Sequence, residues 1–184
     1  MDAASEDSDT PVPFGKNVAV IGGGNTAMDS VRTARRLGAE RAMIIYRRSE
    51  EEMPARIEEV KHAKEEGVEF LTLHNPIEYI ADELGKVKQV ILQKMELGEP
   101  DASGRRSPVA IPGATETIDI DLAIVSVGVS PNPIVPSSIP GLEMGRKGTI
   151  AVNENMQSSI PTIYAGGDIC LLYTSPSPRD MRRS

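Results

Sequence analysis

A run of apolar residues that ends in three glycines, within residues 18–29, constrains the fold of this chain more than any other feature. The segment 17–21 is almost entirely apolar, which is typical of a strand buried on both faces of a parallel sheet. Residues 25–37 then carry apolar side chains at helical spacing, and Gly38 occupies the usual place of a left-handed C-terminal cap. Residues 42–46 are a second apolar run. The pattern predicts a strand–helix–strand unit with a right-handed parallel crossover.

The glycine turn between the first strand and the helix has the form Gly22-x-Gly24-x-x-Ala27. Gly22 allows a tight turn, Gly24 lets the backbone approach a pyrophosphate, and the small Ala27 lets the helix pack close to the strand. The amino end of the helix would offer free N–H groups and partial positive charge to phosphates. Glycine turns also occur for structural reasons alone, but this one follows a strand and opens a helix, which favours dinucleotide binding. The candidate binding residues of the turn are Gly22, Gly23, Gly24, Asn25, Thr26 and Ala27.

Two arginines, Arg47 and Arg48, follow the second predicted strand, where an NAD site usually places a carboxylate. That carboxylate would bind the ribose 2′-hydroxyl, whereas guanidinium groups bind a 2′-phosphate in a bidentate manner. We therefore expect Arg47 and Arg48 to bind NADP(H). The alternative is that both are solvated surface arginines paired with Glu50, Glu51 or Glu52, since exposed ion pairs are common. A carboxylate at Glu50 would also offset part of the preference for NADP(H).

The rest of the chain predicts an α/β fold in which an antiparallel layer accompanies the parallel sheet. A helix is expected from Pro54, which suits a first helical turn, to Gly67. Residues 77–81 and 87–97 flank a charged turn with glycine and predict an antiparallel hairpin. Residues 98–117 are rich in Gly, Pro and Ser, and we expect them to be irregular. Further strands are expected at residues 68–73, 122–127, 149–152 and 162–165.

Composition excludes several classes of protein. With 184 residues the chain can bury the core of one ordinary domain, and its net charge of −7 argues against nucleic acid as the main partner. No apolar run approaches the roughly 20 residues of a membrane helix, and the acidic amino terminus is unlike a secretory signal. The single cysteine, Cys170, cannot form an internal disulfide, and His62 and His74 lack metal-ligand spacing. We expect a cytoplasmic protein with no metal site and no membrane partner.

Several stretches resemble the small subunit of NADPH-dependent glutamate synthase and its relatives, which are FAD- and NAD(P)-binding proteins with the pyridine nucleotide-disulfide oxidoreductase fold. The resemblance rests on five stretches, which are residues 22–29, Tyr46-Arg47-Arg48, Met53-Pro54 with the following Glu-rich segment, residues 95–101 and residues 165–168. The wider group is similar to thioredoxin reductase in its two-dinucleotide fold.

The resemblance implies a Rossmann-like NADPH domain inserted into an FAD domain. Val127 and Gly128 would lie in the segment that returns from one domain to the other. Gly167 and Asp168 would belong to the second flavin-binding motif, with an ordinary Gly-Asp turn as the alternative. The parent protein would pass a hydride from NADPH to FAD, and electrons would go on to iron–sulfur clusters and the large synthase subunit. The cofactors carry this chemistry, so we nominate no catalytic residues.

The family's first FAD fingerprint and its cluster-binding cysteines are absent from this sequence, so we expect a chain truncated at both ends. We expect a lead-in at residues 1–15, the NADP(H)-binding domain at 16–128 and part of an FAD-binding domain at 129–169. Residues 170–184 resemble a translated sequencing adaptor, and we interpret them as a non-native disordered tail, with a natural Ser/Pro tail as the alternative. Two other functions stay open. One is a fragment that binds NADP(H) without turnover, and the other is the same module of a ferredoxin–NADP or dihydropyrimidine dehydrogenase-type reductase.

Overall fold

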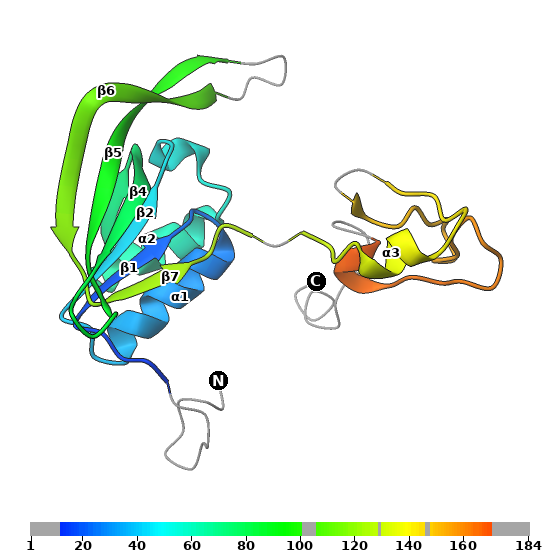
Figure 1. Cartoon of the computed structure of the whole chain (residues 1–184), viewed down its shortest axis with the longest axis horizontal. Helices are drawn as coiled ribbons and strands as arrows, with labels where there is room; N and C mark the ends of the chain where they lie inside the picture. Colours follow the sequence, from blue (N-terminus) through cyan, green and yellow to red (C-terminus); the bar gives the residue numbers. More distant parts are fainter. Residues whose placement is uncertain (1–11, 101–105, 129, 146–147, 171–184) are drawn as a thin grey trace. The chain divides into compact units, whose positions relative to one another are not determined.

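The computed structural model describes residues 12–100, 106–128, 130–145 and 148–170. By its internal contacts the chain divides into two compact units, Met1–Gly128 (unit 1) and Val129–Ser184 (unit 2), as Figure 1 shows. In its described residues, unit 1 holds a parallel sheet, two α-helices and an antiparallel sheet.

The centre of unit 1 is a parallel sheet with the strand order β3-β2-β1-β7. Helix α1 (Asn25–Arg36) connects β1 to β2, and Gly38 follows it at φ +102°, as the predicted left-handed cap requires. The predicted strand–helix–strand unit is therefore present, and the Rossmann-like fold class is confirmed. The strands of this sheet are β1 (Asn17–Ile21), β2 (Arg41–Tyr46), β3 (Glu69–Thr72) and β7 (Leu122–Val125).

A second sheet in unit 1 has three antiparallel strands in the order β4-β5-β6. Strands β4 (His74–Ala81) and β5 (Val87–Pro100) form the predicted hairpin, and the carboxylate of Asp82 closes its turn by accepting the amide of Leu84 at 2.8 Å. Strand β6 (Arg106–Asp119) pairs with β5 and leads into β7 of the parallel sheet. Figure 1 shows β5 and β6 extending well beyond the end of β4.

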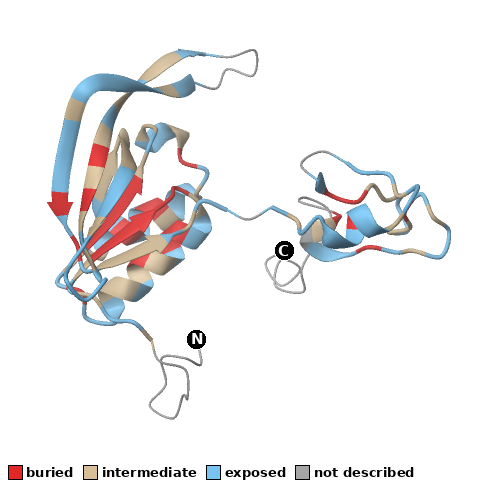
Figure 2. Ribbon diagram, viewed as in Figure 1, coloured by how far each residue is buried: buried red, intermediate tan, exposed pale blue. Residues whose placement is uncertain are grey.

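Each face of the parallel sheet builds its own core, because alternate residues of a strand point to opposite faces. On one face Val18 and Val20 of β1 pack with Met28 of α1, and α2 covers the same face. On the other face Ala19 of β1 packs with Leu92 of β5. Figure 2 shows the buried residues concentrated in these central strands and on the inner sides of the covering layers. The strand ends emerge from a rigid, two-sided core.

The helix expected from Pro54 begins later, so the predicted start is wrong. A 3-10 turn at Glu50–Glu52 comes first, and helix α2 runs over Ile57–Glu65. The amides just before Ile57 are held by the glycine turn rather than by helical acceptors, which delays the start of the helix. The predicted end is close, because Gly67 has φ +78° directly after the helix.

Residues 98–117, expected to be irregular, are mostly strand in the part that the structure describes. That prediction is wrong because β5 continues to Pro100 and β6 begins at Arg106, and the two strands pair across most of the region. Strand β6 lies at the edge of its sheet and pairs only with β5. Pro108 is tolerated there because an edge strand has no neighbour on its other side that would need the missing N–H group. Residues 101–105 lie outside the described part of the chain.

Two further expectations about strands need correction. Strand β7 ends at Val125, before the predicted end at residue 127. The strands expected at residues 149–152 and 162–165 are present only as isolated bridges, which join single residue pairs. Amides of these segments bond to carbonyl oxygens of separate loops instead of one neighbouring strand: the amide of Ile150 donates to Ile169 at 2.7 Å and the amide of Ala165 donates to Met156 at 3.0 Å.

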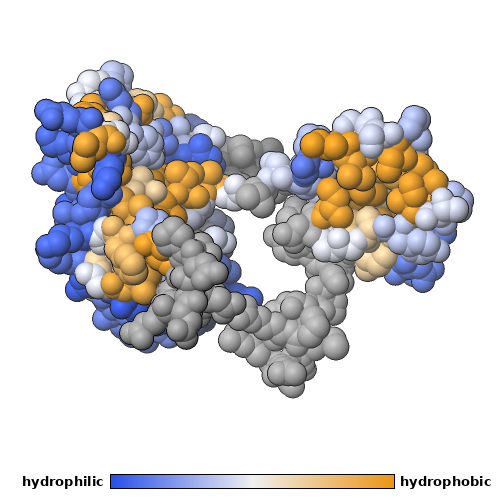
Figure 3. Space-filling view, turned by 60° about the horizontal axis from the view of Figure 1, so that its bottom comes forward, coloured by the Kyte–Doolittle hydropathy of each residue, from blue (hydrophilic) through white to orange (hydrophobic). Residues whose placement is uncertain are grey.

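Unit 2 contains the short helix α3 (Ile134–Ser138), the 3-10 turn η4 (Gly167–Ile169) and a small apolar core around Ala165 and Cys170. Cys170, expected in a disordered tail, is instead buried, and its thiol donates to the carbonyl oxygen of Ala165 at 3.1 Å. The rest of the expected tail, residues 171–184, lies outside the described residues. Figure 3 shows an apolar surface on this unit, and its exposed large apolar side chains are Ile134, Val135, Met144 and Tyr164. In the described ranges, no helix is both long and apolar enough to cross a bilayer.

Candidate functional site

The carboxyl ends of β1, β2 and β7 border a cavity of about 620 Å³ within unit 1, which we call the glycine-turn cavity. Parallel strands end at the same edge of a sheet, so segments far apart in the sequence meet here. Most of the predicted cofactor-binding residues of unit 1 line it, namely Gly22, Gly23, Gly24, Thr26, Arg47, Arg48, Val127 and Gly128. The other lining residues are Ile21, Ile45, Tyr46, Pro54, His74, Asn75, Pro76 and Ser126.

The glycine turn presents backbone rather than side chains to the cavity. Gly22 has φ +143°, and a Cβ atom there would overlap the carbonyl oxygen of Ser126, so no side chain fits between β1 and β7. A Cβ atom on Gly23 would lie 2.7 Å from the ring of Tyr46. At Gly24, by contrast, nothing lies within 4 Å of the position that a Cβ would take. The open space over Gly24 leaves room for a ligand to approach the backbone.

The amino end of α1 adds hydrogen-bond donors and positive charge to the same cavity. Gly24 is the N-cap residue, no side chain caps the helix, and the first turn carries no acidic residue. The first amides of an α-helix have no acceptor within the helix, and the helix dipole places partial positive charge there. This combination suits a phosphate group.

Buried polar atoms without a hydrogen-bond partner gather around the glycine-turn cavity. Among the described residues they are Arg48 Nε and Nη1, Ser49 Oγ, Glu52 Oε2 and His74 Nε2. Arg48 and His74 line the cavity, and the other two belong to the segment that follows Arg48. A buried guanidinium nitrogen without a partner costs free energy, and an anion in the cavity would supply the missing acceptor.

Among the described residues, no ion pair joins Arg47 or Arg48 to Glu50, Glu51 or Glu52, the three carboxylates of the alternative interpretation. Glu50 pairs with Lys64 of α2 at 2.5 Å. Arg47 is exposed and Arg48 is half-buried, and both line the cavity. The cavity therefore keeps a cluster of positive charge at the end of β2.

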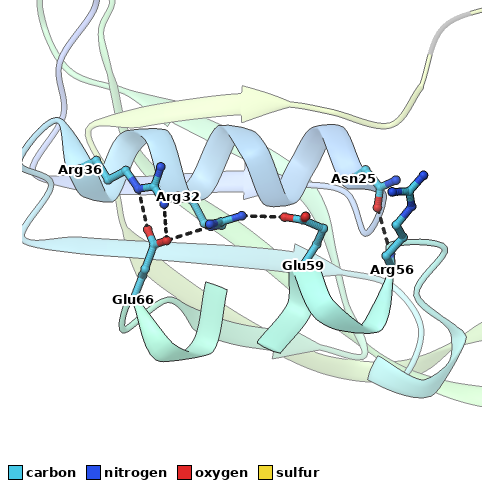
Figure 4. Close-up of polar contacts among 6 residues, drawn as sticks. All are labelled: Asn25, Arg32, Arg36, Arg56, Glu59 and Glu66. Carbon is cyan, nitrogen blue, oxygen red and sulfur yellow. Dashed lines mark hydrogen bonds and ion pairs between the residues drawn. The ribbon is translucent and has the colours of Figure 1, made fainter. Parts of the chain in front are cut away.

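Residues 49–56, the loop between β2 and α2, are fastened to the glycine turn. The amide of Ala55 donates to the carbonyl oxygen of Gly23 at 3.0 Å. The amide of Arg56 donates to Oδ1 of Asn25 at 2.9 Å, as Figure 4 shows. The hydroxyl of Tyr46 donates to a carbonyl oxygen of the same loop at 3.0 Å. These bonds hold the loop and the glycine turn as one surface, so the arginines and the turn keep a defined spacing.

Ion pairs between α1 and α2 fix the direction of the helix whose amino end faces the cavity. Arg32 donates to Glu59 at 2.6 Å and to Glu66 at 3.0 Å, and Arg36 donates to Glu66 at 2.5 Å, as Figure 4 shows. The hydrogen bond from Arg36, assisted by Arg32, holds the pKa of the Glu66 carboxyl below its ordinary value. The charged form of Glu66 therefore stabilises the packing of α1 against α2.

Sequence reasoning missed the contribution of β4 to the cavity, which comes from His74, Asn75 and Pro76. These residues reach the cavity because Leu73 adopts φ +56°, which turns the chain from the parallel into the antiparallel sheet. The amide of Leu73 donates to the carbonyl oxygen of Arg48 at 3.0 Å, so the turn is anchored at the cavity edge. No local pattern around a leucine predicts a left-handed conformation, since this region disfavours side chains.

Four predicted site residues do not line the glycine-turn cavity. Asn25 uses its side chain to hold the 49–56 loop. Ala27 is fully buried, and its Cβ would lie 3.4 Å from a Cβ placed on Gly22. Gly167 and Asp168 belong to unit 2, where they form the 3-10 turn η4. The side chain of Asp168 lies outside the described atoms.

A second cavity in unit 1, of about 600 Å³, is bordered by α1, β7 and the segment before β1. Its lining is mainly apolar and includes Phe14, Leu37 and Val125, and Asp29 gives it a negative charge. Its lining includes neither the three glycines of the turn nor Arg47 and Arg48, so its chemistry does not suit phosphate. Among the described residues, no group of three or more His, Cys, Asp and Glu side chains is placed to hold a metal ion.

A glycine turn between a buried parallel strand and an uncapped helix, with arginines after the next strand, defines a Rossmann-like domain of the dinucleotide-binding class. Comparison with known proteins narrows this class. The family model described as pyridine nucleotide-disulphide oxidoreductase matches residues 1–183. The chain belongs to this family.

Curated relatives are much longer than this chain. It is 47% identical over 157 residues to the putative glutamate synthase (NADPH) small chain of Cereibacter sphaeroides, which covers 84% of this chain and 38% of the relative. It is 42% identical over 159 residues to the glutamate synthase (NADPH) small chain of Escherichia coli strain K12, and the match covers 84% of this chain and 34% of the relative. It is 44% identical over 159 residues to NADP(+)-dependent formate dehydrogenase subunit beta of Moorella thermoacetica, and the match covers 85% of this chain and 22% of the relative. The predicted resemblance to glutamate synthase small subunits is confirmed.

Solved structures agree with the fold. Thioredoxin reductase of T. acidophilum matches with a TM-score of 0.69 at 20% identity, covering 88% of this chain and 47% of that one. Thioredoxin reductase of Lactococcus lactis matches with a TM-score of 0.67 at 22% identity, covering 85% and 45%. At this identity the likeness shows the fold alone, and it agrees with the Rossmann-like fold described above.

Proposed function

We propose that this chain is the NADP(H)-binding module of a flavin-dependent oxidoreductase. The observation that carries the proposal is the glycine-turn cavity, which brings the open backbone of Gly24 together with Arg48 and His74, whose side chains hold buried nitrogens without a hydrogen-bond partner. The pyrophosphate would bind at the amino end of α1, against the open backbone of Gly24. Arg47 and Arg48 would bind the 2′-phosphate.

The residues present fit a dinucleotide. The cavity volume of about 620 Å³ lies within the range of small-molecule sites, roughly 300–1,000 Å³. Gly22, Gly23 and Thr26 would bind the phosphates with the turn, and Val127 and Gly128 would border the ligand from the end of β7. Asn25 and Ala27 would act indirectly, by holding the 49–56 loop and by close packing of α1. NADPH supplies the hydride, and the protein's task is to bind and orient it.

The names of the relatives support NADPH as the hydride donor more strongly than they support any one final electron acceptor. Relatives at 42–47% identity are named for glutamate synthase, and one at 44% is named for formate dehydrogenase, but all of these names include NADP(+) or NADPH. We infer that the parent protein passes the hydride to FAD, with Gly167 and Asp168 contributing to the flavin site. From there electrons would reach iron–sulfur clusters and a partner, for which we favour the large glutamate synthase subunit in the cytoplasm.

A titration with NADPH and NADH tests the proposal. NADPH should bind more tightly by at least about tenfold, because charge-assisted bonds to a phosphate contribute about 1.5–3 kcal/mol. Arg47→Ala and Arg48→Ala should lose most of this advantage without changing NADH affinity. Arg106→Ala, an exposed arginine on β6 outside the cavity lining, is the matched control and should bind as the unmodified chain does. Equal affinities for NADPH and NADH, or unchanged NADPH affinity in Arg47→Ala and Arg48→Ala, would overturn the proposal.

A further inference from the structure

His74 lines the glycine-turn cavity and plays no part in the function proposed above. Its Nδ1 lies 2.6 Å from the carbonyl oxygen of Thr72. A carbonyl oxygen only accepts, so Nδ1 carries a proton in both charge states of the ring. Its Nε2 is buried, has no hydrogen-bond partner, and lies 3.6 Å from Oε2 of Glu116.

A carboxylate and an ammonium group lie beside this ring. Glu116 of β6 and Lys94 of β5 are paired at 3.1 Å, and Lys94 holds the pKa of the Glu116 carboxyl below its ordinary value. Glu116 is therefore a carboxylate near neutral pH. In the neutral ring the Nε2 lone pair faces this carboxylate, whereas in the protonated ring an N–H group faces it. Both ring nitrogens then have an acceptor nearby.

The cavity itself supplies the opposing charges. Arg47 and Arg48 line the same cavity as His74, and without a ligand their positive charges disfavour a further positive charge on the ring. An anion bound beside the arginines cancels that repulsion and favours the protonated ring. The charged groups around His74 are thus Glu116 and Lys94 from the antiparallel sheet and the two arginines that follow β2.

We propose that His74 is a specificity-determining residue, whose protonation strengthens the binding of dinucleotides that carry a 2′-phosphate. This inference rests on the proposed function. By linkage, a ligand that favours the protonated ring binds more tightly as the pH falls through the titration range of histidine. His74 acts through its charge, and it discriminates between NADP and NAD because only NADP brings the additional anionic group.

The test compares NADP⁺ and NAD⁺ affinities of three proteins between about pH 6 and about pH 8.5, on either side of the usual histidine titration. The oxidised nucleotides are used because NADPH decomposes in acid. The proteins are the full unmodified chain, His74→Gln, and His62→Gln as the matched control. His62 is exposed on α2 and lies outside the cavity lining. The 2′-phosphate titrates near pH 6 as well, so variants are compared at the same pH, where the ionisation of the ligand cancels.

We expect His74→Gln to bind NADP⁺ about tenfold more weakly than the unmodified chain at pH 6 and almost equally at pH 8.5, since one interaction with a charged group is worth about a factor of ten in affinity. NAD⁺ affinity should not change, and His62→Gln should follow the unmodified chain. If His74→Gln unfolds, Glu116→Gln serves instead, because losing the carboxylate should move the NADP⁺ advantage to lower pH. A ratio of NADP⁺ affinities that stays constant with pH overturns the role of His74 alone. Equal NADP⁺ and NAD⁺ affinities in the unmodified chain overturn the proposed function as well.

Discussion

Replacing Gly24 by alanine should abolish most nucleotide binding while leaving the fold in place. Gly24 has φ −90° and ψ 176°, a conformation that alanine adopts readily, and nothing lies within 4 Å of the added methyl group. The cost to folding is limited to the poorer N-cap preference of alanine, about 1 kcal/mol or less. The methyl group would occupy the space through which a pyrophosphate approaches the backbone. Displacing the phosphate should cost about 2 kcal/mol, or roughly thirtyfold in Kd.

Gly22→Ala is the matched comparison, because here the damage should fall on the fold. A Cβ at Gly22 would overlap the carbonyl oxygen of Ser126, and φ +143° is unfavourable for any residue with a side chain. Backbone strain and overpacking together should cost about 3 kcal/mol, which for a domain of this size lowers the Tm by about 10 °C.

The assay combines thermal unfolding, followed by circular dichroism, with calorimetric titration of NADP⁺. Gly24→Ala should keep its Tm within about 3 °C of the unmodified chain and lose affinity. Gly22→Ala should unfold at a clearly lower temperature. The reasoning is refuted if Gly24→Ala binds NADP⁺ as tightly as the unmodified chain, or if it lowers the Tm as much as Gly22→Ala does.

Two further predictions concern the loop and the ion pairs. Asn25→Ala removes the acceptor of the Arg56 amide, so it should destabilise the fold by about 1 kcal/mol. It should also raise the Kd for NADP⁺, because the 49–56 loop would be held less firmly against the glycine turn. An unchanged Kd would show that this loop does not position the site. Because Arg36 and Arg32 lower the pKa of Glu66 below 4.5, the stability that this carboxylate provides is present above pH 4.5 and is lost as the pH falls through the lowered pKa. Thermal unfolding across acidic pH should therefore be less steeply pH-dependent in Glu66→Gln, and identical profiles would contradict this.

Local patterns in the sequence were sufficient to predict the parallel sheet and the glycine turn. Residues 18–21 alternate between two cores and are apolar throughout, a pattern typical of a buried parallel strand. The positions of Gly22 and Gly38 follow from backbone geometry that other residues adopt poorly. These features depend on neighbours close in sequence, so they can be inferred without the tertiary structure.

The parts that sequence reasoning missed depend on distant contacts. Strand β6 was not predicted, because its Gly- and Pro-containing segment becomes a strand only through pairing with β5. The start of α2 depends on the bond from Arg56 to Asn25, which joins two segments across the sheet edge. His74 reaches the cavity only because Leu73 takes a left-handed conformation fastened to Arg48.

The account rests on a dinucleotide binding in the glycine-turn cavity, and backbone amide shifts measured by NMR during NADP⁺ titration test this most directly. The account predicts the largest shifts at Gly22, Gly24 and Thr26 and at the two arginines after β2, since these line that cavity. Shifts concentrated at Phe14 and Leu37 of the second cavity, with the glycine turn unchanged, would contradict it.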